Sequence, residues 1–329
     1  MRKFYLKIFS IAIVCSVIVT ISCDAPRENP VDPNNDDNKL SKINGVVKAQ
    51  GYPFVPIKSV NVYWENDNIL VLTDENGKYS ISSVIRNNGW LKFQSNLYSK
   101  DSIFIDWNKS SEIFNETFLN TKPQLDSLEF FSVVKNSWNS ATIKHYLKIK
   151  ARISDYEGVN DIVNVYIENI ELNLLTKLSY DYTNNFYEGT LSLSDLGINS
   201  LDEIIGKYFR ILVNDLDSNT FAIGNTNIKR VINEEIELIS PISNEEVNTS
   251  FKLNWIRFIL GFNFTYRVEI YTNETLQSLV YSKGNIEKDS ISLSVNSHVG
   301  EGNFFWIIWA IDEFNNQGSS KQGSFIISN

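Results

Sequence analysis

The sequence has few of the residues on which disulfides, metal centres and catalysis most often depend. Its 329 residues include two histidines and two cysteines, Cys15 and Cys23. Because both cysteines lie near the start, the rest of the chain has no disulfide, and its cores must be stabilised by packing alone. The chain also lacks the motifs of zinc proteases, serine hydrolases and phosphate-binding loops. We therefore expect a protein that is not an enzyme.

Positive charge and long apolar runs are also scarce. The 39 acidic residues outnumber the 30 basic ones, which gives a net charge of −9. An acidic chain is a poor partner for nucleic acid, so we expect none. After residue 23 no apolar run reaches the about 20 residues that a membrane-spanning helix needs.

The N-terminus does carry a clear signal. Three positive charges come first, at Arg2, Lys3 and Lys7. An apolar run then covers residues 8–21, and the small residue Ser22 stands directly before Cys23. This pattern is typical of a secretion signal. It resembles a bacterial lipoprotein signal peptide, which implies cleavage after residues 1–22 and lipid attachment at Cys23. The alternative is an uncleaved anchor helix, although the apolar run is short for one.

Residues 23–40 contain three prolines and a run of Asn and Asp. This composition predicts a solvated, disordered tether. Several acyl chains on one protein make a lasting membrane anchor. We therefore expect a lipid-anchored protein of the cell envelope outside the cytoplasm, at the outer membrane or cell surface rather than the inner membrane.

From Ile43 onward the chain consists of short alternating segments rich in Val, Ile, Tyr, Phe and Trp. Turn residues interrupt them about every ten residues, which is typical of all-β sandwiches of roughly 100 residues each. We predict three tandem β-sandwich domains, immunoglobulin-like or transthyretin-like, over residues 41–119, 125–234 and 236–329. The best helical candidate is the stretch 193–205.

The first predicted domain has an ordered pattern of short motifs. Ile-Asn-Gly-Val-Val begins at residue 43, Pro-Ile-Lys-Ser-Val-Asn-Val-Tyr at 56, and Leu-Thr-Asp-Glu-Asn-Gly-Lys-Tyr at 72. In the third motif Asp74 and Gly77 predict a tight turn, with a positive φ at Gly77. The order resembles the carboxypeptidase regulatory-like domain. That resemblance implies a transthyretin-like sandwich, related in shape to starch-binding-like folds, without catalytic residues.

The other two domains carry weaker patterns. Leu147, Ile149 and Ala151 alternate with basic residues, and the domain looks like a bacterial immunoglobulin-like domain. Trp255 and the segment 302–312 make the last domain similar to a fibronectin type III-like module. A faint repeat relates Val213-Asn-Asp to Ala310-Ile-Asp, which fits two related sandwiches in tandem.

An aromatic surface is the first candidate site. If Phe304, Trp306 and Ile308 face the core, their neighbours must face the opposite side of the strand. With one residue of the adjacent strand, this predicts an exposed platform formed by Trp309, Phe305, Ile307 and Tyr271. Such patches are seldom left bare. Three interpretations remain open: packing against the second domain or another copy, a protein partner, or a carbohydrate-stacking platform.

An acidic group is the second candidate. One loop carries three carboxylates and another carries two, and in an immunoglobulin-like sandwich both loops lie at one end: Asp155, Glu157 and Asp161, with Asp215 and Asp217. Hard oxygen ligands in that arrangement suit Ca²⁺. The alternative is ordinary turn chemistry, since Asp is a preferred turn residue. We expect no other cofactor or metal.

The function most consistent with these features is non-enzymatic. We expect surface display, adhesion or scaffolding through sandwich faces, with a protein or glycan partner at the cell surface. One alternative is a carbohydrate-binding envelope lipoprotein that uses the aromatics of the third domain. A second is a hydrolase with an unrecognised carboxylate site, which would show clustered carboxylates with strongly perturbed pKa values.

Overall fold

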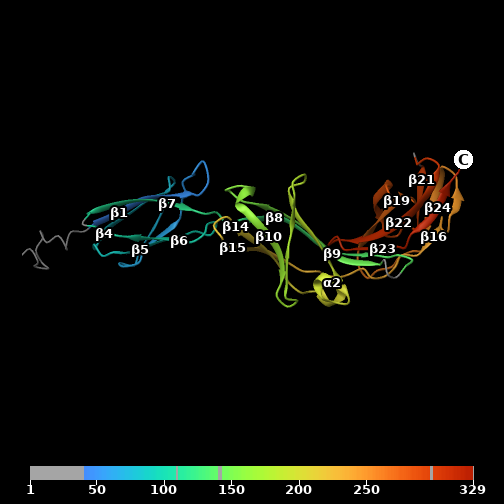
Figure 1. Cartoon of the computed structure of the whole chain (residues 1–329), viewed down its shortest axis with the longest axis horizontal. Helices are drawn as coiled ribbons and strands as arrows, with labels where there is room; N and C mark the ends of the chain where they lie inside the picture. Colours follow the sequence, from blue (N-terminus) through green and yellow to red (C-terminus); the bar gives the residue numbers. More distant parts are fainter. Residues whose placement is uncertain (1–40, 109, 140–142, 297–298, 329) are drawn as a thin grey trace, which may run out of the picture. The chain divides into compact units, whose positions relative to one another are not determined.

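The computed structural model describes residues 41–329 except 109, 140–142, 297–298 and 329. The chain divides into two compact units, residues 1–122 and 123–329, and several strands of each are labelled in Figure 1. The predicted signal segment, Cys23 and the tether lie outside the described residues. Within the described part, no helix is both long enough and apolar enough to cross a membrane.

The first unit is a β-sandwich of two sheets with strand orders β4-β1-β7 and β3-β2-β5-β6. Its strands are β1 Ser41–Ala49, β2 Asn61–Trp64, β3 Ile69–Leu72, β4 Lys78–Val84, β5 Gly89–Gln94, β6 Asp101–Ile105 and β7 Glu112–Leu119. The predicted turn is present, because Gly77 has a φ of 69° and Asp74 accepts hydrogen bonds from the backbone amides of Asn76 and Lys78. The core between the sheets includes Trp64 and Phe93.

The second unit begins with a middle sandwich. One sheet has the order β12-β13-β9-β8 and the facing sheet has the order β11-β10-β14-β15. The strands are β8 Gln124–Lys135, β9 Lys144–Ser154, β10 Ile162–Asn169, β11 Leu174–Lys177, β12 Ser179–Asp181, β13 Phe186–Ser192, β14 Phe209–Asp215 and β15 Thr220–Thr226. Leu147, Ile149 and Ala151 are buried in its core, as their alternation predicts.

The stretch 193–205 contains short helical turns rather than one helix. Helix α2 spans Leu193–Leu196, and the 3₁₀ turn η4 spans Leu201–Ile204. Ser192 and Ser200 cap them through capping boxes, which satisfy backbone amides that have no partner within the turn. Gly197, with a φ of 66°, ends α2.

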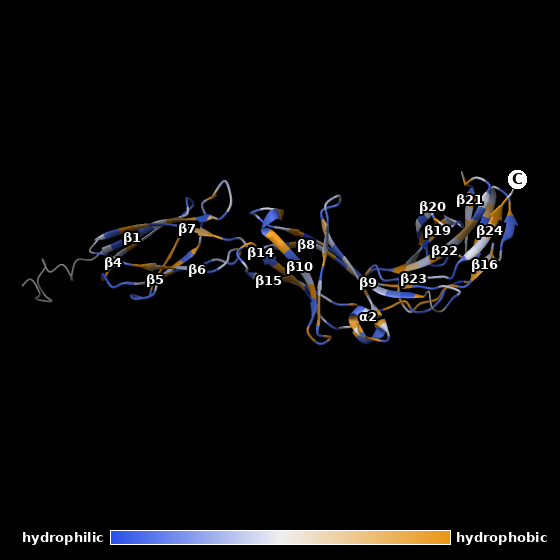
Figure 2. Ribbon diagram, in the orientation of Figure 1, coloured by the Kyte–Doolittle hydropathy of each residue, from blue (hydrophilic) through white to orange (hydrophobic). Residues whose placement is uncertain are grey.

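The C-terminal sandwich completes the second unit. Its strands are β16 Leu238–Ser240, β17 Glu245–Val247, β18 Ser250–Trp255, β19 Phe264–Thr272, β20 Leu279–Glu287, β21 Ser292–Asn296, β22 Gly302–Asp312, β23 Gln317–Ser319 and β24 Gly323–Ile327. Trp255, Tyr266 and Trp306 fill its core. In Figure 2 hydrophobic segments lie within strands such as β10 and β24, and the all-β fold is as predicted.

The two sandwiches of the second unit share one sheet. Strand β23 pairs in parallel with β8, with Gln317 opposite Val133 and Gly318 opposite Val134. The sheet therefore runs from β12 in the middle sandwich to β20 in the C-terminal one. Each sandwich keeps its own core, and Ile232 already belongs to the C-terminal core, slightly before residue 236. The sequence predicts two tandem sandwiches here, and the structure has two cores within one compact unit.

Candidate functional site

The predicted aromatic platform is buried. Phe305, Ile307 and Trp309 form a cluster with Phe131 and Val133 of strand β8, and Trp309 is 6% exposed. The prediction that these side chains face away from the C-terminal core is correct, because Phe304, Trp306 and Ile308 fill that core. The prediction of an exposed platform is wrong, and of the three interpretations the structure shows packing against the second domain. The sheet continues into the middle sandwich, so β8 contributes side chains that cover this face.

The polar groups of this interface cluster are satisfied inside the protein. The indole Nε1 of Trp309 donates a hydrogen bond to Oε2 of Glu269 over 2.7 Å, and the hydroxyl of Tyr271 donates to the same oxygen over 2.9 Å. Tyr271 stacks on Phe305 with ring centroids 5.3 Å apart. Burial raises the pKa of Tyr271 to about 12, and the hydrogen bond to Glu269 adds to this effect. The cluster therefore stabilises a domain interface.

Hydrogen bonds between the sandwiches extend this interface. The side-chain oxygen of Asn316 accepts from the backbone amide of Ser132 at 2.9 Å and from its hydroxyl at 3.0 Å. Asn136 donates to the carbonyl of Ser319 at 2.7 Å. Arg230, from the segment that connects the sandwiches, lies 3.6 Å from the buried carboxylate of Asp312. Charge and hydrogen bonding are thus matched across the junction.

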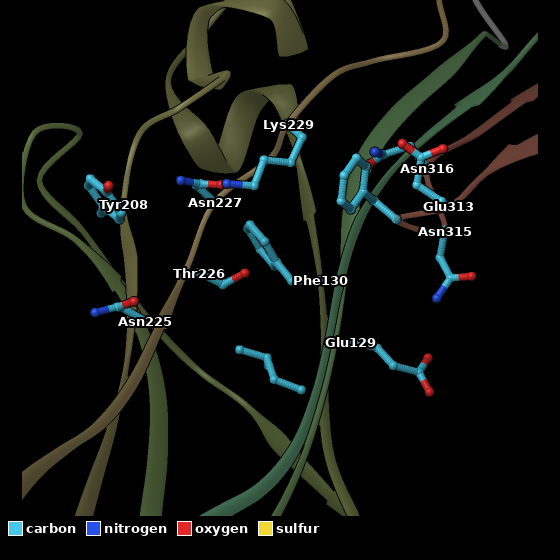
Figure 3. Close-up of a pocket in the computed structure, with 12 residues that line it drawn as sticks. Glu129, Phe130, Tyr208, Asn225, Thr226, Asn227, Lys229, Glu313, Asn315 and Asn316 are labelled. Carbon is cyan, nitrogen blue, oxygen red and sulfur yellow. The ribbon is translucent and has the colours of Figure 1, made fainter. Parts of the chain in front are cut away.

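A pocket of about 450 Å³ lies beside this junction (Figure 3). Phe130, Asn225, Asn227 and Asn316 are among the residues that line it, and carboxylates, hydroxyls and one ammonium group line it as well. One of its carboxylates, Glu313, is held by Arg230 at 3.0 Å. We assign no chemistry to this pocket.

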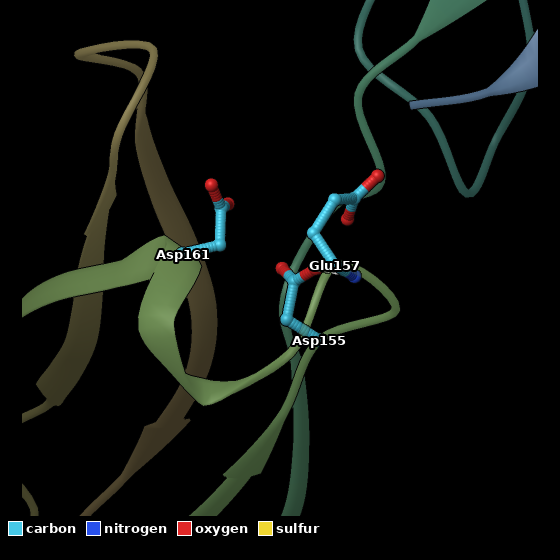
Figure 4. A group of neighbouring side chains, drawn as sticks. All are labelled: Asp155, Glu157 and Asp161. Atoms are coloured by element: carbon cyan, nitrogen blue, oxygen red, sulfur yellow. Dashed lines mark hydrogen bonds between the residues drawn. The ribbon is translucent and has the colours of Figure 1, made fainter. Parts of the chain in front are cut away.

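The acidic group gathers three of its five predicted members. The ligand oxygens of Asp155, Glu157 and Asp161 all lie within 4.8 Å of one another (Figure 4). They come from the loop between β9 and β10, which ends in the 3₁₀ turn η3, Val159–Asp161. Gly158 lets the loop reverse, since its φ is 97°. The turn brings Asp161 back to the two carboxylates that begin the loop.

One oxygen of each of these three carboxylates is closed to solvent, although Asp155 and Glu157 as residues are only half-buried. Oδ1 of Asp155 accepts a hydrogen bond from the backbone amide of Glu157 at 3.0 Å. Oδ2 of Asp155 and Oδ2 of Asp161 are buried and have no hydrogen-bond partner among the described residues. Burial is the main cause that raises the pKa of Asp155 to about 8, and contact with Glu157 is the second. Burial is also the main cause that raises the pKa of Asp161, and the negative charges of Asp215 and Glu157 raise it further.

The remaining two acids lie outside the gathered group. Asp215 is buried at the end of β14, where its carboxylate accepts from the backbone amide of Asn219 at 2.7 Å and from its side chain at 2.9 Å. This is the turn chemistry that the sequence offers as the alternative. Asp215 and Asp217 still act on Asp161, because both negative charges raise the pKa of its carboxyl group.

An exposed aromatic surface lies where the sequence analysis does not place one, on the outer face of the sheet β3-β2-β5-β6 in the first unit. Trp90 is 46% exposed and Phe104 55%, with their rings 5.4 Å apart at a steep angle. Strand period two is the signal that could have found it, since Leu91 and Phe93 point into the core and Trp90 must point outward.

Comparisons with known proteins give a weak likeness only. No protein-family model matches the chain, and no curated protein matches it. The fibronectin(III)-like modules of Clostridium thermocellum CbhA share 16% identity over 63% of this chain and 93% of that one, with a TM-score of 0.29. The FN1–FN3 domains of chicken CNTN1 share 7% identity over 82% of this chain and 91% of that one, with a TM-score of 0.32. The Bacillus anthracis TIE protein shares 10% identity over 88% of this chain and 48% of that one, with a TM-score of 0.26. Values this low carry no argument about function.

Proposed function

We propose that this chain is a non-enzymatic, lipid-anchored protein of the bacterial envelope that displays or scaffolds a binding face at the cell surface. The observation that carries the proposal is the interface cluster between the middle and C-terminal sandwiches. Phe131 and Val133 of one sandwich pack with Phe305, Ile307 and Trp309 of the other. Buried apolar area of this kind stabilises one fixed arrangement of two domains. A fixed two-domain body on a lipid tether suits display more than catalysis.

The acidic group supports the non-enzymatic side of this proposal. A carboxylate that hydrolyses a glycoside must reach the scissile bond or a water molecule beside it. The buried Oδ2 atoms of Asp155 and Asp161 are closed to solvent and therefore to a substrate. A raised pKa alone does not make an active site.

The lipid anchor is tested by metabolic labelling with a fatty-acid probe in a bacterial host. We expect acyl label on the wild type and its loss in Cys23→Ala, with release of the variant from the membrane fraction. Cys15→Ala is the matched control, because it removes the other cysteine. The control should keep both label and membrane association. Label that persists in Cys23→Ala would contradict the anchor.

A second candidate function is glycan binding through the exposed face of the first unit. Tyr63 and Leu70 border a hollow of about 560 Å³ on the sheet β3-β2-β5-β6, together with the polar side chains of Asn61, Lys92 and Gln94. On the same face, Trp90 and Phe104 are exposed. Aromatic faces beside amide and ammonium donors are suited to stacking and hydrogen bonding with sugar rings.

Affinity gel electrophoresis against a panel of soluble polysaccharides tests this second function. We expect retardation of the wild type on at least one polysaccharide and its loss in Trp90→Ala. Trp138→Ala is the matched control, because Trp138 is also exposed but belongs to the second unit. Equal retardation of both variants, or none for the wild type, would remove glycan binding by this face.

A further inference from the structure

The acidic loop of the middle sandwich gathers three carboxylates around the buried side chain of Asp161. Three carboxylates place their oxygens within 4.8 Å of one another. Within the described residues, neither Asp155 nor Asp161 forms an ion pair. Like charges at this distance repel strongly when water is excluded. The loop therefore needs a cation or a bound proton to be stable at neutral pH.

Asp161 supplies a second observation that points to a ligand. Its side chain is only 8% exposed, and its Oδ2 atom is buried without a hydrogen-bond partner in the described structure. That atom belongs to a carboxylate that lies beside those of Asp155 and Glu157 in Figure 4. A buried charged oxygen without a partner is costly, and native proteins seldom keep one unless water or an ion satisfies it.

The equivalent end of the C-terminal sandwich shows how this chain neutralises a buried acid when a basic side chain is near. There the carboxylate of Asp312 is buried, and Arg230 lies 3.6 Å from it. At the end of the middle sandwich, Asp215 occupies the matching place beside Asp161, and the neighbouring charges that act on Asp161 are acidic. A bound cation would offset the acidic charges that act on Asp161.

We propose that Asp155, Glu157 and Asp161 bind one Ca²⁺ ion. Hard carboxylate oxygens are the ligands that Ca²⁺ prefers, and its bonds of about 2.3–2.6 Å let ligands on opposite sides of the ion lie about 5 Å apart. The 4.8 Å limit on the three oxygens fits that span. Mg²⁺ forms shorter bonds of about 2.0–2.1 Å in near-ideal octahedral geometry, so oxygens up to 4.8 Å apart suit the larger Ca²⁺ better. Asp215 and Asp217 do not join the ligand group but strengthen the field that attracts the ion.

Isothermal titration calorimetry and thermal unfolding test this proposal on residues 24–329, which keep both folded units intact. After treatment with EDTA, we expect CaCl₂ to bind at one site per chain and to raise the melting temperature. Asp161→Asn should weaken binding by roughly tenfold or more, because a charged ligand becomes a neutral one. Asp181→Asn, in the exposed turn between β12 and β13, is the matched control and should bind Ca²⁺ like the wild type.

The metal-free melting temperature separates loss of a ligand from misfolding. Without Ca²⁺, Asp161→Asn should be at least as stable as the wild type, because it removes one of the repelling charges. A variant that merely misfolds would be less stable. The proposal fails if millimolar CaCl₂ gives neither heat nor a shift with the wild type, in which case a shared proton neutralises the loop. An equal response to MgCl₂ would overturn the assignment to Ca²⁺.

Discussion

The middle and C-terminal sandwiches contain the same turn in different surroundings. One turn begins at Asp215 and closes at Asn219, and the other begins at Asp312 and closes at Asn316. In each, the Asn side chain donates to the Asp carboxylate, over 2.9 Å in the first and 3.0 Å in the second. In each, the backbone amide of the Asn also donates to that carboxylate, over 2.7 and 2.8 Å. The faint sequence repeat is therefore a repeated structural element.

What surrounds the two turns differs. The turn at Asp312 lies in an interface, where Arg230 approaches the carboxylate and Asn316 binds Ser132. The turn at Asp215 lies beside Asp161, and the negative charges of Asp215 and Asp217 both raise the pKa of that carboxyl group. The local turn sequence sets the backbone, whereas the neighbouring charge decides whether the turn joins two domains or attracts an ion.

The largest expected effect comes from removing the centre of the interface. Trp309→Ala should lower the free energy of unfolding of the second unit by about 3–5 kcal/mol, because it deletes a buried indole and leaves a cavity. Guanidinium denaturation monitored by circular dichroism measures it. Leu276→Ala, at a side chain that is 81% exposed, should change this free energy by no more than about 0.5 kcal/mol. Equal losses in the two variants would show that the interface contributes little.

A smaller effect is expected from the basic partner of the C-terminal turn. Arg230→Ala leaves the buried carboxylate of Asp312 without its cation and should cost about 1–3 kcal/mol. Arg257→Ala is the control, because its ion pair with Asp289 is exposed and such pairs contribute at most about 1 kcal/mol. The same denaturation experiment compares them. A cost for Arg230→Ala no larger than for Arg257→Ala would argue against the charge matching at this turn.

Replacing an acid by its amide should change stability in opposite directions at the end of the C-terminal sandwich and at the end of the middle sandwich. In metal-free protein, Asp312→Asn should lower the melting temperature, because Arg230 loses the buried one of its two carboxylate partners. Asp161→Asn should raise it slightly, because burial and neighbouring acids already disfavour the ionised form. Differential scanning calorimetry in EDTA measures both. If both substitutions shifted the melting temperature in the same direction, the proposed difference in charge between the two turns would be contradicted.

The smallest expected effect is a pH dependence. The folded-state pKa of Asp155 is raised to about 8, above the value near 4 for an unfolded Asp. Ionisation of Asp155 therefore destabilises the fold, and the penalty grows as pH rises from about 4 to about 8. In metal-free protein, the stability of Asp155→Asn relative to the wild type should increase over that range. A difference that is flat with pH would contradict the raised pKa.

Strand periodicity predicted most of the fold. The alternation around Leu147 and Ile149 placed both in a core, and the residues 304–309 were assigned to the correct faces of their strand. Periodicity specifies which side of a strand a residue lies on, but it does not specify what covers that side. The pairing of β8 with β23 joins residues about 180 apart in sequence, and no local pattern encodes it. The exposed platform was wrong for that reason.

The acidic site was predicted in part for a related reason. The carboxylates at 155, 157 and 161 are close in sequence, so a short loop can gather them. Which acids converge depends on the 3₁₀ turn that carries Asp161 back, and on the hydrogen bonds to Asn219 that occupy Asp215. Those are three-dimensional contacts, which the spacing of acids alone does not determine.

A distance measurement between the middle and C-terminal sandwiches tests the central claim most directly. The sequence has no cysteine after residue 23, so Tyr182→Cys and Leu276→Cys, both at exposed positions in different sandwiches, place two spin labels cleanly. Double electron–electron resonance should give one narrow distance distribution in the wild-type background and a broader one with Trp309→Ala. A broad distribution in the wild-type background would contradict a fixed two-sandwich unit.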